Sequence, residues 1–168
     1  MNEKSPLLVG VVCAVVLCTL AIGAARSVAA AAGDAGRPPG DVDAARLRAA
    51  DAEPQNWFTG GRDRDGTYYS PLANIDDRNV GRLGFAWEYD LGSPMRGQEA
   101  TPIVVDGVMY TSGTWGYIYA VEAATGRPLW RYDPNAAPMA GRNPCCDLVN
   151  RGVAVWQGRV YVGSVDGR

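Results

Sequence analysis

The sequence contains no histidine among its 168 residues. This absence excludes imidazole as a general base, the histidine triads of hydrolases, HExxH zinc sites and CxxCH haem attachment within the chain. Basic residues are not in excess either, since 16 Lys and Arg stand against 18 Asp and Glu. We therefore expect no nucleic-acid partner. Long helical patterns are also missing, whereas 8 Tyr, 5 Trp and 21 Gly favour short strands joined by turns.

An apolar stretch near the N-terminus predicts export. Leu7–Ala25 carries no charge, Lys4 precedes it, and Ser27-Val28-Ala29 resembles a signal-peptidase site. The stretch is also nearly long enough to span a bilayer, so residues 1–29 are interpreted as either a signal peptide or an uncleaved N-terminal membrane anchor. Either alternative predicts a periplasmic location, in which disulfides can form. The anchor would be the chain's one contact with a membrane.

The next region, residues 30–52, predicts a linker followed by a short helix. Ala31–Gly40 is rich in Ala, Gly and Pro, as flexible or extended linkers are. Asp41–Ala52 has the composition of a helix with acidic residues in its first turn, and it ends before Pro54. Residues 53–168 then form a third region, which is dominated by strand and turn signals.

Four short antiparallel strands are predicted between Ala100 and Asp133. Asp-Gly at positions 106 and 107 is a typical hairpin turn, and glycine-containing loops separate the later strands. The predicted strands are Pro102–Val105, Val108–Ser112, Tyr117–Val121 and Pro128–Tyr132. Together they form one blade-like sheet.

This unit recurs along the chain. Ile103–Tyr110 aligns with Ala154–Tyr161, and Asn79–Trp87 forms an earlier half-unit that ends in Trp, as Arg127–Trp130 does. Four-stranded repeats of roughly 40 to 50 residues are typical of a β-propeller, although a single β-sandwich is an alternative. A propeller needs about four to eight blades. The all-β fold class is therefore expected with only about the first two blades present, as in the N-terminal fragment of a longer protein.

Two adjacent cysteines, Cys145 and Cys146, interrupt the repeat. Neighbouring Cα atoms lie about 3.8 Å apart across a trans peptide, whereas ordinary disulfides join Cα atoms roughly 4.4 to 6.8 Å apart. A bond between them would close a small strained ring, and this ring would serve as a rigid platform rather than as a staple. Two buried thiols that pack as small hydrophobes are the alternative.

Three motifs resemble the pyrroloquinoline quinone (PQQ) dehydrogenases. Ala120–Trp130 resembles their tryptophan-docking repeat, with Glu122 in place of the usual Asp. Gln98–Pro102 resembles the first cofactor-contacting turn of the PQQ alcohol dehydrogenases, and Cys145–Gly152 resembles the family's vicinal-disulfide motif. The resemblance covers about residues 41–168.

The resemblance implies an eight-bladed propeller with PQQ near its axis. Cys145 and Cys146 would form the disulfide ring against one face of PQQ, and Arg151 and Glu99 would bind the polar edges of the cofactor. A guanidinium suits the carboxylates of this planar anionic quinone. Arg151 is also the partner that a buried Glu99 would need. An ordinary structural ion pair is the alternative for these two residues.

The implied activity is the oxidation of a small alcohol by PQQ, with electrons passed to a cytochrome c. A Ca²⁺ or lanthanide ion would act as Lewis acid and a carboxylate as base. The matching residues are expected beyond residue 168. No catalytic residue and no metal ligand is therefore assigned here, and Asp63, Asp65 and Asp147 are interpreted as turn residues. The chain alone is expected to bind PQQ poorly and to be inactive.

Two other functions remain open on the sequence. One is a non-enzymatic propeller that shares the Trp repeat and acts as a scaffold or assembly protein. The other is a metal or redox switch at the adjacent thiols, although the other soft ligands that a metal prefers are missing. The cysteine pair and Gln98-Glu99 favour the dehydrogenase over both, because a scaffold has no use for a ring that faces a cofactor.

Overall fold

Strands make up most of the regular structure in the computed structural model, which describes residues 37–92, 97–137 and 147–168. The predicted leader, residues 1–29, and the pair Cys145 and Cys146 lie outside these ranges. Within them, no helix combines the length and the apolar composition needed to cross a bilayer. The elements are α1 (Ala44–Arg48), η1 (Ala50–Ala52), η2 (Val80–Arg82), β1 (Ile103–Val105), β2 (Val108–Ser112), η3 (Thr114–Gly116), β3 (Ile118–Glu122), β4 (Pro128–Tyr132), β5 (Ala154–Trp156) and β6 (Arg159–Tyr161).

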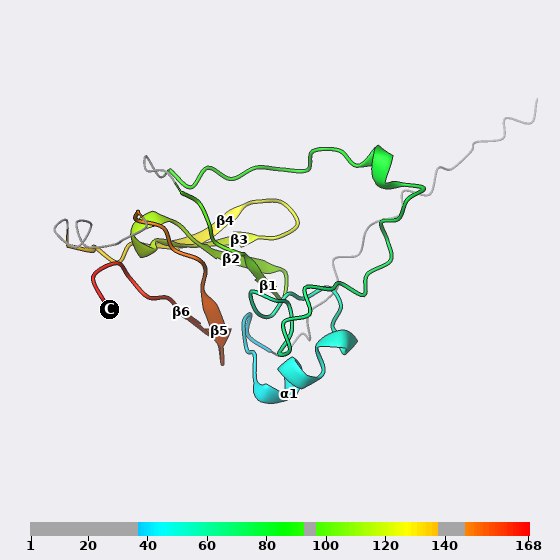
Figure 1. Cartoon of the computed structure of the whole chain (residues 1–168), viewed down its shortest axis with the longest axis horizontal. Coiled ribbons are helices and arrows are strands. Elements are labelled where there is room, and N and C mark those ends of the chain that lie inside the picture. Colours follow the sequence, from blue (N-terminus) through cyan, green and yellow to red (C-terminus); the bar gives the residue numbers. More distant parts are fainter. Residues whose placement is uncertain (1–36, 93–96, 138–146) are drawn as a thin grey trace, which may run out of the picture.

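The predicted four-stranded blade is confirmed. Its strands are antiparallel and lie in the order β1-β2-β3-β4 (Figure 1). β2 and β4 have the predicted bounds, whereas β1 and β3 begin one residue later than predicted. Burial falls from the centre of the sheet to its edge, because β3 is almost wholly buried and every residue of β4 is exposed. The core of this sheet therefore lies on the β1–β3 side.

The predicted correspondence of residues 103–110 with 154–161 is confirmed by a second hairpin of the same geometry, whereas the predicted half-unit at 79–87 contains the 3₁₀ turn η2 and no strand. β5 and β6 pair with Ala154 opposite Tyr161, just as β1 and β2 pair with Ile103 opposite Tyr110. Both hairpins turn through two residues of positive φ: 53° and 76° in the Asp-Gly turn at 106 and 107, and 47° and 72° in the Gln-Gly turn at 157 and 158. Two consecutive left-handed residues define a type I′ turn, whose twist matches that of the strands.

The predicted helix is present but shorter than expected. Asp43 lies just before it with extended backbone, and its side chain accepts a hydrogen bond from the Arg46 N–H at 2.8 Å. This hydrogen bond lowers the pKa of the Asp43 carboxyl. Asp43 thus caps the helix instead of occupying its first turn, and the α-helix gives way to the 3₁₀ turn η1 after Arg48.

The segment 38–58, here called the N-terminal strap, connects the two hairpins. The Gly158 N–H donates to the Gly40 carbonyl at 2.9 Å, and the Gln157 N–H donates to the Val42 carbonyl at 2.8 Å. The strap also contacts the first hairpin, because Trp57 forms an antiparallel bridge with Val104 of β1. The middle of the strap forms α1, which lies below the first sheet in the view of Figure 1.

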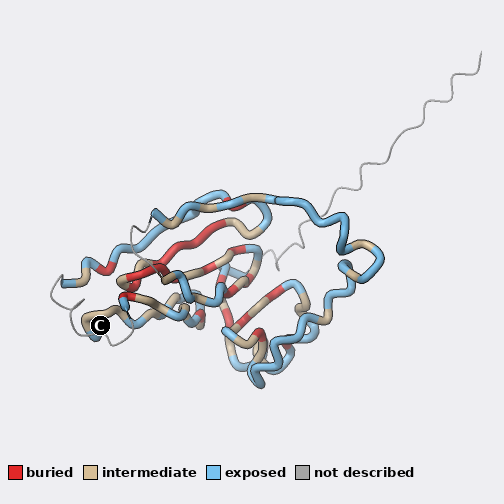
Figure 2. The backbone as a smooth tube through the Cα atoms, turned by 45° about the horizontal axis from the view of Figure 1, so that its top comes forward, coloured by how far each residue is buried: buried red, intermediate tan, exposed pale blue. Residues whose placement is uncertain are grey.

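The hydrophobic core forms where the strap, the first sheet and β5 meet, and Figure 2 shows the buried stretches of the backbone in red. Its members are Val42, Ala50, Phe58, Ile103, Val105, Val108, Tyr110, Ala120 and Val155. Because these residues come from all three parts, the core holds the two sheets at a fixed relative position. The loops that connect the sheets therefore start from fixed strand ends.

Residues 64–92 are mostly exposed; the segment begins near α1 and its later part, from η2 onward, runs along the other side of the first sheet (Figures 1 and 2). The half-unit predicted here ends in Trp87, whose indole N–H donates to the Ala123 carbonyl at 3.1 Å. Gly126 lies directly against this ring, because a Cβ there would be 2.5 Å from Trp87 Cε3. The Trp of one unit thus packs on the turn of the next, and the Tyr119 hydroxyl adds a hydrogen bond to the Leu91 carbonyl at 2.7 Å.

Candidate functional site

The structure brings Glu99 and Arg151 together from two loops that are far apart in the sequence. Glu99 precedes β1 and Arg151 precedes β5, and Arg151 Nη2 lies 3.2 Å from Glu99 Oε2. The Arg151 side chain is 71% exposed and the Glu99 side chain 46%. Glu99 is thus paired with Arg151, but it is not buried as the sequence reasoning supposed. Glu99 is the one ionic partner of Arg151 among the described residues, so within them this exposed guanidinium has donors left for an anionic ligand.

The two loops that carry this ion pair are also joined through their backbones. The Thr101 N–H donates to the Arg151 carbonyl at 3.3 Å. Gly97 lies so close to the second loop that a Cβ there would be 2.5 Å from Val149 Cγ1, and its φ is +92°. Only glycine combines this backbone conformation with this approach. The sequence before Glu99 therefore fits closely against the segment before Arg151.

The cysteine pair lies outside the described residues, directly before this segment. The first described residues after it, Asp147 and Leu148, contact the turn between β2 and β3, because the Trp115 N–H donates to the Leu148 carbonyl at 3.0 Å. A hollow of about 350 Å³ is lined by Gly116, the segment 147–150 and the segment 163–165. The chain on the C-terminal side of the cysteines is thus fixed against both sheets.

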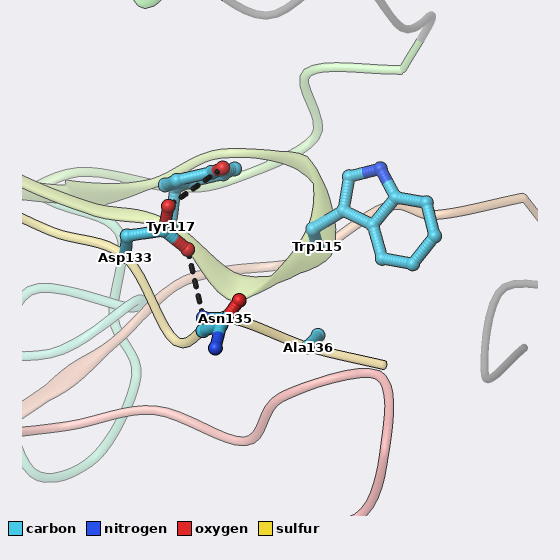
Figure 3. A pocket seen from close by; sticks show the side chains of 5 residues that line it. All are labelled: Trp115, Tyr117, Asp133, Asn135 and Ala136. Carbon is cyan, nitrogen blue, oxygen red and sulfur yellow. Dashed lines mark hydrogen bonds between the residues drawn. The ribbon is translucent and has the colours of Figure 1, made fainter. Parts of the chain in front are cut away.

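A second cavity, of about 220 Å³, lies beside the same turn (Figure 3). Its wall consists of Trp115, Tyr117, Asp133, Asn135 and Ala136. The Tyr117 hydroxyl donates to Asp133 Oδ2 at 3.0 Å, while the Asn135 N–H donates to Asp133 Oδ1 at 2.7 Å. Both oxygens of the carboxylate are thus engaged, which holds the wall in place.

No group of three or more Cys, Asp or Glu residues that could hold a metal ion occurs in the described part of the chain. Asp63 is a turn residue, as predicted, because its Oδ1 accepts the N–H groups of Asp65 and Thr67 at 3.1 Å. The hydrogen bond from the Thr67 hydroxyl, and after it these two backbone hydrogen bonds, lower the pKa of Asp63. Asp147 Oδ1 likewise accepts the Leu148 N–H at 2.8 Å.

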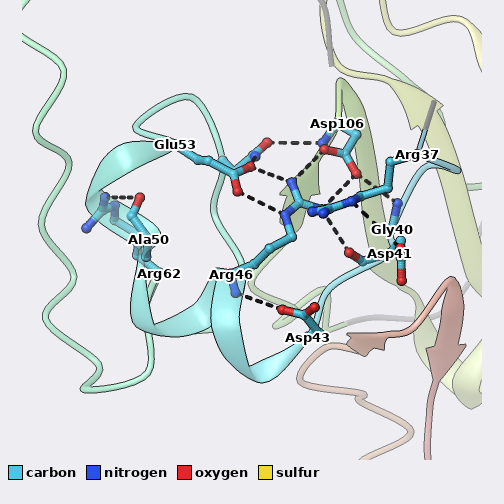
Figure 4. Close-up of polar contacts among 10 residues, drawn as sticks. Arg37, Gly40, Asp41, Asp43, Arg46, Ala50, Glu53, Arg62 and Asp106 are labelled. Atoms are coloured by element: carbon cyan, nitrogen blue, oxygen red, sulfur yellow. Dashed lines mark hydrogen bonds and ion pairs between the residues drawn. The ribbon is translucent and has the colours of Figure 1, made fainter. Parts of the chain in front are cut away.

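A second arginine cluster, which the sequence reasoning missed, joins the strap to the first hairpin (Figure 4). Arg46 is 7% exposed and lies 2.5 Å from Glu53 Oε2 and 2.7 Å from Asp106 Oδ1. Its guanidinium also lies 5.2 Å from the centre of the Phe58 ring. The hydrogen bonds from Arg46 lower the pKa of Glu53, and the two carboxylates raise that of Arg46. One signal was available, since the spacing of Val42, Arg46 and Ala50 would place them on one face of the predicted helix 41–52.

A model of the PQQ family, described as the glucose/ethanol/alcohol dehydrogenase β-propeller domain, matches residues 57–168. The chain belongs to this family. A quinohemoprotein alcohol dehydrogenase, ADH-IIG from Pseudomonas putida, is 52% identical over 150 residues, which are 89% of this chain and 21% of that relative. A 1-butanol dehydrogenase (cytochrome c) from Thauera butanivorans is 55% identical over 112 residues, 67% of this chain and 16% of that protein.

Solved structures of the PQQ dehydrogenases agree with this assignment. The ADH-IIG structure from Pseudomonas putida superimposes with a TM-score of 0.74 and 56% identity, over 76% of this chain and 19% of that one. A europium-containing methanol dehydrogenase gives a TM-score of 0.64 and 32% identity, over 71% and 21% of the two chains. The predicted relation to PQQ-dependent alcohol dehydrogenases is confirmed. The chain spans about a fifth of the length of the relatives that it matches.

Proposed function

We propose that this chain provides one wall of the PQQ site in an alcohol-oxidising quinoprotein with an eight-bladed propeller. The observation that carries the proposal is the exposed ion pair between Arg151 and Glu99, which two adjoining repeats of a PQQ-family propeller bring together. Arg151 would bind a carboxylate of the cofactor, and Glu99 would orient the guanidinium and accept a hydrogen bond from the polar edge of PQQ.

The described residues fit such a ligand in their chemistry and their shape. Glu99 contacts one terminal nitrogen of Arg151, so the remaining N–H groups of this exposed side chain can meet an anion. Gly97 and Val149 lie in direct proximity beside the pair, which leaves no room for a further side chain there. PQQ, when bound, supplies the quinone that accepts a hydride from the alcohol.

The roles of this chain's own residues are binding and orientation. Arg151 would bind PQQ through its positive charge and its oriented N–H donors, and Glu99 would fix the position of Arg151. Cys145 and Cys146, outside the described residues, would form the flat support for the quinone ring. A Ca²⁺ or lanthanide ion, with ligands beyond residue 168, would complete the site, and electrons would pass to a cytochrome c. The names of two relatives support these last points: one is cytochrome c-linked and the other contains europium.

The proposal is tested by transplanting residues 57–168 into the matching segment of Pseudomonas putida ADH-IIG. The chimera is expected to reduce an artificial dye with a primary alcohol once PQQ and Ca²⁺ are added. Arg151→Met in the chimera should weaken PQQ binding by about 10- to 100-fold, since a hydrogen bond between charged groups contributes roughly 1.5 to 3 kcal/mol. Arg159→Met, an exposed arginine of β6, is the matched control and should change nothing. A folded chimera whose PQQ affinity is the same with either substitution would contradict the proposal.

The cysteine pair has a direct test of its own. We expect Cys145 and Cys146 to be bonded to each other in the PQQ-loaded enzyme. Alkylation before reduction, followed by mass spectrometry, should find neither thiol labelled. Two labelled thiols in active enzyme would show that the flat support is absent.

We further propose that the chain is exported to the periplasm, on the basis of its apolar stretch and the Ser-Val-Ala sequence at 27–29. N-terminal sequencing of the protein from a periplasmic extract should begin close to Ala30. An intact N-terminus in the membrane fraction would indicate an anchor, and full-length protein in the cytoplasm would refute export.

A further inference from the structure

Ser112, at the end of β2, lies at the meeting point of the two loops that carry Glu99 and Arg151. The residue is fully buried, with 0% of its surface exposed. It belongs to the buried alternation Val108, Tyr110, Ser112 along β2, so a polar side chain occupies a core-facing position there. A buried hydroxyl needs a hydrogen-bond partner, and this partner comes from the second loop.

Asn150, the residue before Arg151, supplies that partner. Its Oδ1 accepts the Ser112 hydroxyl at 2.6 Å and the Gly152 N–H at 3.1 Å, and its Nδ2 donates to the Gly163 carbonyl at 2.8 Å. One side chain thus connects β2 of the first sheet, the chain after β6 of the second, and its own loop. Both acceptor positions of the amide are used, which fixes its orientation.

Gln98, the residue before Glu99, contacts Ser112 as well. Its Nε2 donates to the Ser112 carbonyl at 2.8 Å. The residues immediately before Glu99 and Arg151 therefore both bind one buried serine, one through its carbonyl and the other through its hydroxyl. Because Ser112 is part of a paired strand, it provides a fixed reference for both loops.

We infer that Ser112, Gln98 and Asn150 are positioning residues that set the separation of Glu99 and Arg151 for an anionic quinone ligand. This inference rests on the proposed function. An exposed ion pair of two long side chains is weakly held by itself. The hydrogen bonds to Ser112 are made by the side chains of the residues just before Glu99 and Arg151, so they restrict each loop next to its charged residue without occupying the charged group.

The test uses the full-length enzyme that contains these residues, from which PQQ has been removed. PQQ is added back, and its binding is followed by the tryptophan fluorescence of the protein. Ser112→Ala and Asn150→Ala should each raise the PQQ dissociation constant about tenfold, the size expected for the loss of one hydrogen bond. The turnover number at saturating PQQ should stay within about twofold, because the positioning residues do not touch the reacting atoms. Asn74→Ala, on the exposed segment 64–92, is the control and should leave PQQ affinity unchanged.

The double variant distinguishes positioning through Ser112 from two separate effects. If Asn150 acts through the serine hydroxyl, Ser112→Ala adds little to the loss already caused by Asn150→Ala. Full additivity would overturn the inference. Should either core-facing variant fail to fold, Gln98→Met removes the other hydrogen bond from an exposed position, and unchanged affinity in that variant would also overturn it.

The outcome of Arg151→Met in the same titration distinguishes this inference from the proposed function. Loss of PQQ binding in Arg151→Met together with wild-type affinity in the Ser112, Asn150 and Gln98 variants would leave the proposed function in place and reject the positioning role. Wild-type affinity in Arg151→Met would reject both.

Discussion

Arg46 and Arg151 each pair with carboxylates from distant parts of the chain, yet their surroundings differ. Arg46 is enclosed by the strap and the first hairpin, and its guanidinium contacts Glu53, Asp106, the Asp41 carbonyl and the Phe58 ring. Arg151 has one described ionic partner, Glu99, and most of its surface is open. The N–H donors of Arg46 bind groups within the protein, whereas Arg151 has donors that no described residue uses.

This difference separates an arginine that stabilises a fold from one that is suited to a ligand. Exposed ion pairs contribute roughly 0 to 1 kcal/mol, so the position of Arg151 has little value for stability. Removing one member of an enclosed cluster leaves charges without a partner and costs about 3 to 5 kcal/mol. Substitution of Arg46 should therefore lower stability, whereas substitution of Arg151 should lower PQQ affinity.

The largest effect is expected at the enclosed cluster. Arg46→Met should lower the free energy of unfolding by about 3 kcal/mol, because Glu53 and Asp106 would keep their charges in a partly dehydrated place. Arg48→Met, in the same helix but exposed, should change it by less than about 0.5 kcal/mol. Urea unfolding followed by tryptophan fluorescence measures both. Equal denaturation midpoints for the two variants would show that the enclosed Arg46 contributes no more to stability than the exposed Arg48.

Exchanging the two charges of the open pair should separate binding from stability. In the double variant Glu99→Arg with Arg151→Glu an ion pair can still form, so the free energy of unfolding should stay within about 0.5 kcal/mol of the original. PQQ affinity should nevertheless fall at least about 100-fold, because the charge that faces the cofactor's carboxylates is reversed or displaced. Retained affinity would mean that PQQ does not contact these residues.

A smaller effect concerns the pH dependence of stability. The pKa of Glu53 is lowered in the folded protein, chiefly by its hydrogen bond from Arg46. Its contribution is thus fully present above the ordinary glutamate pKa of about 4.5 and is lost as the pH falls through the lower folded value. Glu53→Gln should flatten the decline of stability below about pH 4.5, whereas Glu88→Gln, at an exposed position, should not. Parallel pH profiles for the two variants would contradict this assignment.

The sequence predicted the local parts of this structure well. Two-residue turns such as Asp106-Gly107 constrain both the turn and the register of the flanking strands, so the strands of the first sheet lie within one residue of their expected bounds. The contact between Trp87 and Gly126, by contrast, was found only in the structure. The ion pair between Glu99 and Arg151 followed from a family motif, not from any local pattern.

Contacts over long sequence distances could not be predicted in this way. Arg46 and Asp106 are separated by 60 residues, and Ser112 and Asn150 by 38. Nothing in the neighbourhood of either residue specifies its partner, because the pairing depends on how the strap and the sheets pack. The strap itself was interpreted as a linker and helix, since its hydrogen bonds to the second hairpin arise only when that hairpin is in place.

The strap also implies an order of events during synthesis. Gly40 and Val42 bind Gly158 and Gln157, which leave the ribosome roughly a hundred residues later. At about 5 to 20 residues per second, the strap waits on the order of 5 to 20 seconds for these partners. During this interval Val42 and Phe58, both buried in the final structure, lack part of their cover. The nascent chain therefore presents the strap to chaperones and proteases until the second hairpin has formed.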